Sequence, residues 1–208
     1  MKKFFFVTLE GIDGAGKTTQ ASIVADMLTS RGYEVFSFRE PGSTELGNEV
    51  RKLLFNKTLE LNDYTELFLF MAARAELISK VLYKAKPDSI VIGDRFWDST
   101  IAYQHYGKGL SLDIIRQIKN TPPFSVTPDI TFWLDIPIDL STQREEGDSN
   151  ISNHNALLLN KVRNGFKAIY ESEPERIVKI DGTADRESVS NKIIKLIENS
   201  YNHKKKHG

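Results

Sequence analysis

The chain has 208 residues, which suits one ordinary domain with a sizeable core and is too short for two. Its 28 Lys and Arg residues balance 28 Asp and Glu residues, so no net charge draws nucleic acid or an anionic membrane to it, and any positive potential must be local to a cleft. The absence of cysteine excludes disulfides and thiolate metal sites, and no apolar stretch reaches the roughly 18 residues that span a membrane. The chain begins directly with a predicted strand and without a cleavable signal, so we expect a cytoplasmic protein.

Short apolar runs alternate with helical patterns along the whole chain. The runs, which predict strands, span residues 4–9, 34–38, 89–93, 130–134 and 177–180. Apolar residues at helical spacing fill the intervals, at 21–28, 44–54, 64–82, 100–120 with a break near 107–109, 138–144, 156–171 and 187–200. This alternation predicts an α/β fold, a five-stranded parallel sheet with helices on both faces, within one domain of residues 1–208. We expect residues 203–208 to form a frayed, solvated end.

A phosphate-binding motif follows the first predicted strand. The run Gly11-Ile12-Asp13-Gly14-Ala15-Gly16-Lys17-Thr18 fills every fixed position of the pattern G-x-x-x-x-G-K-[ST]. Glycines let the backbone turn its N–H groups around an anion, the following helix directs its positive end at the same point, and the lysine adds an ammonium group. The sequence therefore predicts a site for a nucleoside triphosphate, in which the hydroxyl of Thr18 suits Mg²⁺.

The third predicted strand ends in Asp94, directly before Arg95. Because the carboxyl ends of parallel strands meet at one edge of a sheet, we expect the Asp94 carboxylate near the Mg²⁺ shell and the Arg95 guanidinium where a second phosphate meets the first. The chain lacks the Asn-Lys-x-Asp motif that selects guanine, which disfavours an ordinary GTPase. These observations favour a kinase of small molecules.

A series of short motifs, taken in their order and spacing, resembles the thymidylate kinase family. The motifs are the loop from Gly11 to Thr19, Arg39-Glu40-Pro41-Gly42-Ser43-Thr44, Phe70-Met71-Ala72-Ala73-Arg74, Asp94-Arg95-Phe96, Ala102-Tyr103-Gln104 and Pro128-Asp129, and together they span most of the chain. The resemblance implies a P-loop NTPase fold with a short, flexible LID. It also implies transfer of the γ-phosphoryl group of ATP to dTMP, giving dTDP for dTTP synthesis, with Mg²⁺ and in a homodimer.

The residues themselves give such an acceptor site a physical basis. Phe70 and Arg74 lie four positions apart on a predicted helix, so they face one pocket, the first with a flat apolar surface and the second with a fork of donors. Because arginine only donates, Arg74 favours the O4 carbonyl of thymine over the amino group of cytosine. We expect Arg39 and Arg95 to hold the acceptor phosphate close to ATP.

The resemblance implies roles for the remaining candidate residues. It places Tyr103 near the 2′ position of the sugar, Thr100 and Gln104 near the base, and Asp13 at the 3′ hydroxyl. The predicted dTMP site consists of Asp13, Arg39, Phe70, Arg74, Arg95, Thr100, Tyr103 and Gln104. The predicted ATP site consists of Gly11, Ile12, Asp13, Gly14, Ala15, Gly16, Lys17, Thr18, Thr19 and Arg144, the predicted catalytic residues are Lys17, Arg95, Asp13 and Arg39, and the predicted metal ligands are Thr18 and Asp94.

The chain departs from the family pattern at the LID, which we predict at about 144–155. With Ala15 in the phosphate loop, the chain resembles members that carry a catalytic arginine on the LID, yet residues 145–154 contain no Arg or Lys. An arginine of this kind contributes about a thousandfold or more in rate. The candidates to replace it are Arg144, Lys161, Arg163 and a residue of a partner subunit.

This gap leaves more than one function open. We favour an active dTMP kinase whose LID chemistry is altered. The alternatives are a kinase of another deoxynucleoside monophosphate and a nucleotide-binding regulatory protein that transfers phosphate poorly. The sequence also leaves open whether Glu40 and Asp135 touch Mg²⁺ or only organise their loops.

Overall fold

The computed structural model describes residues 3–146 and 156–207. Five strands of the described chain form one parallel sheet in the order β2-β3-β1-β4-β5, as predicted. They are β1 (Phe5–Glu10), β2 (Val35–Arg39), β3 (Ile90–Asp94), β4 (Ile130–Asp135) and β5 (Ile177–Asp181). The chain runs from β1 to one side of the sheet and, after β3, crosses to the other. The loops that follow β1 and β3 therefore adjoin the point where the strand order reverses, which is where such sheets bind ligands.

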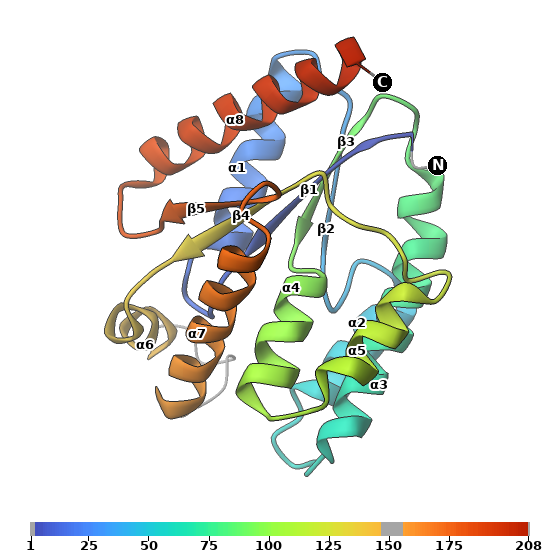
Figure 1. Ribbon diagram of the computed structural model, residues 1–208, viewed down its shortest axis with the longest axis vertical. Coiled ribbons are helices and arrows are strands. Elements are labelled where there is room, and N and C mark those ends of the chain that lie inside the picture. Colours follow the sequence, from blue (N-terminus) through green and yellow to red (C-terminus); the bar gives the residue numbers. More distant parts are fainter. Residues whose placement is uncertain (1–2, 147–155, 208) are drawn as a thin grey trace.

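Helices cover both faces of this sheet (Figure 1). The strands β1, β3 and β4 are buried at every position, as expected for strands that are covered on both sides. On one face, α1 (Lys17–Ser30) packs against α8 (Arg186–His207). On the other face, α7 (Ala156–Ser172) packs against η2 (Ile101–Gly107) and against β4 and β5. This arrangement leaves the carboxyl ends of the strands free to carry a site.

The remaining helices frame that edge of the sheet. They are α2 (Glu45–Leu54), α3 (Asp63–Lys80), η1 (Leu82–Lys84), α4 (Trp97–Thr100), α5 (Leu112–Asn120) and α6 (Ile138–Glu146). Side-chain caps set the start of two of them, because Thr44 accepts from the backbone N–H of Gly47 (2.9 Å) and Asn62 accepts from that of Tyr64 (3.0 Å). No helix within residues 3–146 and 156–207 is long and apolar enough to cross a membrane.

The structure corrects the sequence-based expectation at two places. The helical segment expected at 100–120 already begins at Trp97, and η2 within it is a π-helix, a form that is frequent at functional sites. The expected end is exposed at residues 202–206, as predicted, but it is not frayed, because α8 continues to His207. The hydroxyl of Tyr201 donates to the carbonyl of Asp88 (2.8 Å), and Lys204 pairs with Asp129 (2.8 Å), so the last turns are anchored to the body.

Candidate active site

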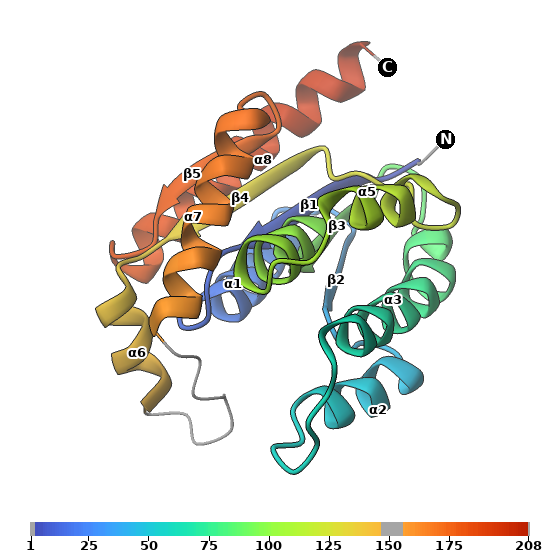
Figure 2. The same ribbon diagram turned by 60° about the horizontal axis from the view of Figure 1, so that its bottom comes forward.

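A cleft of about 860 Å³ opens at the carboxyl ends of the strands. Residues of α2, α3, α6 and α7 contribute to its lining. Figure 2 shows α2 and α3 on one side of the molecule and α6 and α7 on the other. Most of the predicted site residues line the cleft: Asp13, Gly14, Ala15, Gly16, Lys17, Thr18, Thr19, Arg39, Phe70, Arg74, Asp94, Arg95, Thr100, Tyr103, Gln104 and Arg144. Gly11 and Ile12, at the start of the phosphate loop, are buried and do not line the cleft. The structure thus brings the predicted triphosphate and acceptor residues to one cavity.

The glycines of the phosphate loop serve its geometry. Gly11 has a φ of +144°, and a Cβ atom there would come within 2.5 Å of the carbonyl oxygen of Leu134. Gly16 has a φ of +87° and stands at the start of α1. Larger residues are disfavoured at both positions, by strain and, at Gly11, also by collision with the neighbouring strand. The backbone is thereby free to wrap around an anion at the N-terminus of α1.

Lys17 is held in the middle of this loop. Its Nζ donates to the carbonyl of Ile12 (2.7 Å), and the side chain is almost fully buried. Burial, followed by the positive charge of Arg95, lowers the pKa of Lys17 to about 8. A bound phosphate would stabilise the charged form of Lys17, because its negative charge offsets both the burial and the positive charge of Arg95.

Thr18 and Asp94 form the pair expected to hold a metal ion. The Thr18 hydroxyl donates to Oδ2 of Asp94 (2.5 Å), which joins the start of α1 to the end of β3. The other carboxylate oxygen of Asp94, Oδ1, is buried and has no hydrogen-bond partner among the described residues. A hydroxyl beside a carboxylate with a spare oxygen fits Mg²⁺, which binds few protein groups and takes its other ligands from phosphates and water.

Arg95 turns into the cleft directly after β3. Its backbone adopts a left-handed conformation with a φ of +73°. Its guanidinium donates to the carboxylate of Asp13, to the carbonyl of Gly11 (3.1 Å) and to Oγ of Ser99 (3.0 Å), and it lies over the ring of Tyr103 (5.1 Å). The Tyr103 hydroxyl donates to the other oxygen of Asp13 (2.9 Å). Asp13, Arg95 and Tyr103 therefore form one unit between the phosphate loop and η2.

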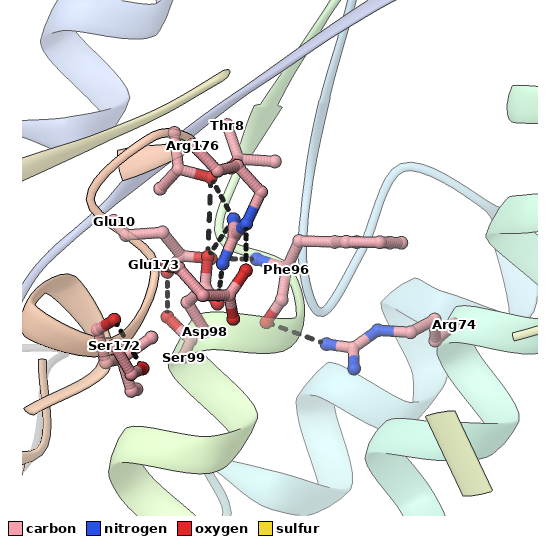
Figure 3. Close-up of polar contacts among 11 residues, drawn as sticks. Thr8, Glu10, Arg74, Phe96, Asp98, Ser99, Ser172, Glu173 and Arg176 are labelled. Carbon is pink, nitrogen blue, oxygen red and sulfur yellow. Dashed lines mark hydrogen bonds and ion pairs between the residues drawn. The ribbon is translucent and has the colours of Figure 1, made fainter. Parts of the chain in front are cut away.

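A buried carboxylate, that of Glu10, is linked to this unit through Ser99 (Figure 3 shows Glu10 and Ser99). Glu10, the last residue of β1, accepts from the backbone N–H of Phe96 (2.7 Å) and from the hydroxyl of Ser99, and Ser99 in turn accepts from Arg95. Burial, followed by the negative charge of Asp98, raises the pKa of Glu10 to about 7. The sequence motifs do not include Glu10. The available signal is that a glutamate ends an otherwise uncharged strand whose every residue is buried.

A buried ion pair between Asp98 and Arg176 anchors α4 near Glu10 (Figure 3). Arg176 donates to both oxygens of Asp98 (2.8 Å each) and also to Glu173 (2.6 Å) and Thr131 (2.7 Å). Asp98 and Arg176 are both largely buried. Such a pair fixes geometry more than it adds stability, since desolvation offsets much of the attraction. It holds the helix that follows Arg95 against β4.

Arg74 is buried rather than exposed, and most of its donors are already used. Its Nε and Nη2 donate to Glu40, Nη2 also donates to the carbonyl of Phe96 (3.1 Å, Figure 3), and Nη1 donates to the Thr100 hydroxyl (2.9 Å). Its guanidinium lies over the rings of Phe96 (4.9 Å) and Trp97 (4.4 Å). Since arginine has five N–H groups, these bonds leave one N–H, on Nη1. Glu40 therefore organises Arg74, and its pKa is raised because burial outweighs the attraction of Arg74.

The basic residues that line the cleft include one that the motifs miss. Arg39, at the end of β2, and Arg51, in α2, both line the cleft. Arg51 donates to the carbonyl of Pro41 (3.2 Å) and lies over the ring of Phe55 (4.7 Å). Burial, followed by the positive charge of Arg39, lowers the pKa of Arg51. Arg51 belongs to none of the sequence motifs. Its place in the cleft depends on the packing of α2 on α3, which a short motif does not reveal.

The structure describes the basic residues of this chain that are candidates to replace the LID arginine. Arg144 donates to the carbonyl of Gly14 (3.0 Å) and lines the cleft, next to the phosphate loop. Arg163 instead forms two bonds with Asp135 (2.6 and 3.0 Å), which Lys179 also contacts (2.8 Å). Asp135 thus organises basic side chains of α7 and β5. Residues 147–155 of the predicted LID lie outside the described residues.

Comparisons with known proteins all find one family. A family model described as thymidylate kinase matches residues 9–193. The chain is 39% identical to a thymidylate kinase of Prosthecochloris aestuarii over 206 residues, covering 92% of each chain. It is 36% identical to a thymidylate kinase of Kosmotoga olearia over 194 residues, covering 91% of this chain and 93% of the other. A crystal structure of thymidylate kinase from Ehrlichia chaffeensis superposes with a TM-score of 0.76 at 37% identity, over 93% of this chain and 98% of the other.

Proposed function

Since the chain belongs to the thymidylate kinase family and transfers a phosphoryl group from ATP to dTMP, giving dTDP, we propose that this transfer takes place in the cleft at the carboxyl ends of the strands. The observation that carries the proposal is the convergence of the phosphate loop and the acceptor residues on one cavity. The relatives favour neither a kinase of another nucleotide nor a regulatory protein.

The thymine base is proposed to lie against Phe70. This side chain is half-buried and lines the cleft, so its ring offers a flat apolar surface. The remaining N–H of Arg74 suits the O4 carbonyl of thymine, since the other donors are held by Glu40, Phe96 and Thr100. Gln104 also lines the cleft, and among the described residues its Oε1 is buried without a partner. An acceptor in that place suits the N3–H of thymine.

The sugar and the acceptor phosphate are assigned to the unit around Arg95. Asp13 offers carboxylate oxygens to the 3′ hydroxyl, and the ring of Tyr103 beside it occupies the space that a 2′ hydroxyl would need. Arg39, Arg51 and Arg95 supply positive charge to the phosphate. Bringing this phosphate close to the triphosphate requires such charge, because the two anions repel each other.

ATP is assigned to the phosphate loop and Arg144. The backbone N–H groups of residues 14–19 and the N-terminus of α1 face the triphosphate, and Lys17 lies among them. Arg144 is proposed to pack near adenine, and its bond to the carbonyl of Gly14 in the phosphate loop supports this assignment. Arg144 is also our first candidate for the missing LID charge, because it lines the cleft, whereas Arg163 is engaged with Asp135 and Lys161 is an exposed residue of α7 that is not among the residues lining the cleft.

Magnesium is proposed to bind at Thr18 and Asp94. The hydroxyl of Thr18 and the spare Oδ1 of Asp94 fit a hard cation that prefers oxygen ligands. When bound with ATP, the ion supplies positive charge to the β- and γ-phosphates. In the described part of the chain no three His, Cys, Asp or Glu side chains are grouped to hold a metal ion.

The chain's own contribution to the transfer is alignment and charge. Phosphoryl transfer passes through a loose transition state, so a strong protein base is not needed. Lys17 and Arg95 place positive charge on the two sides of the migrating group. Preorganised donors of this kind are typically worth about 10²–10³ in rate each.

We also propose that the protein acts as a cytoplasmic homodimer. On α2, Leu46 and Leu53 are each 45% exposed, and on α3 Phe68 is 57% exposed. Large apolar side chains on two adjacent helices are typical of a surface that a second subunit covers. Light scattering after size exclusion tests this, and Phe68→Glu is expected to yield a monomer. The need for ATP supports the cytoplasm as the place of action.

The test of the site is an acceptor profile with matched variants. ADP formation is measured with Mg-ATP and dTMP, dUMP, dCMP, dGMP or dAMP, with Lys17→Ala as the background. We expect dTMP to be the preferred acceptor, and Phe70→Ala to raise the KM for dTMP by about tenfold or more without changing the KM for ATP. A rise in the KM for ATP instead would overturn the placement of the base.

A further inference from the structure

The orientation of the Gln104 amide is fixed by a carboxylate that belongs to none of the sequence motifs. Gln104 lies in η2 and Glu66 in α3, and Nε2 of Gln104 donates to Oε1 of Glu66 (2.9 Å). An ionised carboxylate accepts hydrogen bonds and cannot donate them. Glu66 therefore holds the NH₂ end of the amide, and the carbonyl end is turned the other way.

The charge of Glu66 is itself held in place. Lys108 donates to its second oxygen, Oε2 (2.6 Å), and also lies 3.1 Å from the carboxylate of Asp63. Burial works against the charge of Lys108, but the hydrogen bonds and charges of Glu66 and Asp63 outweigh it and raise the pKa of Lys108. Lys108 thus occupies Oε2 of Glu66, and Oε1 is the oxygen that accepts from Gln104.

The carbonyl of Gln104 is left for a ligand. The side chain is only 2% exposed, and within the described residues its Oε1 has no hydrogen-bond partner, although the residue lines the cleft. A buried acceptor of this kind is unfavourable until something donates to it. The N3 atom of thymine carries a proton, whereas N3 of cytosine is an acceptor. A fixed carbonyl therefore accepts from one base and repels the other.

We propose that Glu66 is a positioning residue that determines base specificity: it fixes the Gln104 amide so that only a pyrimidine with an N3–H is well bound. The inference rests on the proposed contact between Gln104 and the base. In Glu66→Gln the new amide both donates and accepts, so Gln104 is free to turn and to offer its NH₂ to cytosine. Arg74 still opposes the amino group of cytosine, so the preference for dTMP weakens without reversing.

The experiment compares kcat/KM for dTMP with kcat/KM for dCMP at saturating Mg-ATP. A merely structural role of Glu66 would affect folding or ATP binding and would change both values of kcat/KM alike. Such effects cancel in the ratio. We expect Glu66→Gln to lower it by about tenfold or more. The matched control is Asp63→Asn. It also removes one negative charge from α3 next to Lys108, but Asp63 contacts Lys108 and not Gln104. We expect this control to leave the ratio within about twofold.

A double-substitution cycle separates the inference from the contact on which it rests. In a Gln104→Ala background, Glu66→Gln is expected to change the ratio no further, because Glu66 acts through Gln104. If Gln104→Ala lowers the ratio and Glu66→Gln does not, or if the two effects add, the positioning role is overturned while the base contact stands. If Gln104→Ala leaves the ratio unchanged, the base contact is wrong and the inference falls with it.

Discussion

The half of the cleft that we propose for the acceptor nucleotide is built from buried side chains with several partners each, whereas the half that we propose for the donor, ATP, is built mainly from the backbone of the phosphate loop. Arg74 and Arg95 each bind three or more groups of the protein, and Gln104 is held by Glu66. Around the triphosphate position, the loop depends on glycines with positive φ, and Arg144 is exposed. A base must be selected by its edge, which needs fixed side chains, while phosphates are alike in every nucleotide and need only N–H groups and charge.

We expect the largest effect from the substitution of Arg74, a buried residue of the acceptor half. In Arg74→Met the buried carboxylate of Glu40 loses its counter-ion, and leaving one buried charge unpaired costs about 3–5 kcal/mol of stability. We expect urea unfolding to show a loss in this range and the KM for dTMP to rise. The double variant Arg74→Met with Glu40→Gln is the control, since it removes both charges. A double variant as unstable as the single one would contradict the explanation.

The pH dependence of stability tests the buried state of Glu10, which is linked to Arg95 through Ser99. The pKa of Glu10 is about 7 in the folded protein and near 4.5 in the unfolded chain, so between these values the folded state binds more protons. Stability is therefore expected to fall as pH rises from 4.5 to 7, by about 3 kcal/mol, relative to Glu10→Gln, whose side chain has no charge to gain. Denaturant unfolding of both proteins at several pH values measures the difference. Parallel profiles would show that Glu10 is ionised throughout.

Lys17 provides the corresponding pH test in the donor half. Its pKa near 8 in the free enzyme means that it loses its proton above pH 8, while bound triphosphate favours the charged form. We expect the Kd for ATP to rise about tenfold between pH 7 and pH 9, because binding then requires proton uptake. Calorimetry in two buffers of different ionisation enthalpy measures this uptake. Lys17→Arg stays protonated, so an equal rise in that variant would count against Lys17.

Arg144 is expected to have the smallest effect. It is exposed and shares one recorded bond with the backbone of Gly14, so Arg144→Ala is expected to raise the KM for ATP by about threefold and to leave the KM for dTMP unchanged. Initial rates at varied ATP measure it, beside Arg163→Ala, whose partner is Asp135. A loss of a hundredfold or more in kcat would instead make Arg144 the replacement for the LID arginine.

The sequence predicted the sheet and the phosphate loop because both are encoded locally. The apolar runs place all five strands to within a residue at each end, and the loop needs only consecutive residues. It did not predict Glu10, Arg51 or Glu66, since each becomes relevant only when separate elements pack together. The expected frayed end at 203–208 failed for the same reason: a string of polar residues does not reveal that Tyr201 and Lys204 bind the loops before β3 and β4.

The anchored end of α8 has a practical consequence for immobilised enzyme. Tyr201 packs on Phe5 (5.7 Å) and bonds to Asp88, so the last turns lie at the amino ends of the strands, on the opposite side of the sheet from the cleft (Figure 1). A surface tether attached at the carboxyl terminus therefore leaves the nucleotide sites facing solution. On a biosensor chip, a protein captured in this way presents its cleft in one orientation to both nucleotides.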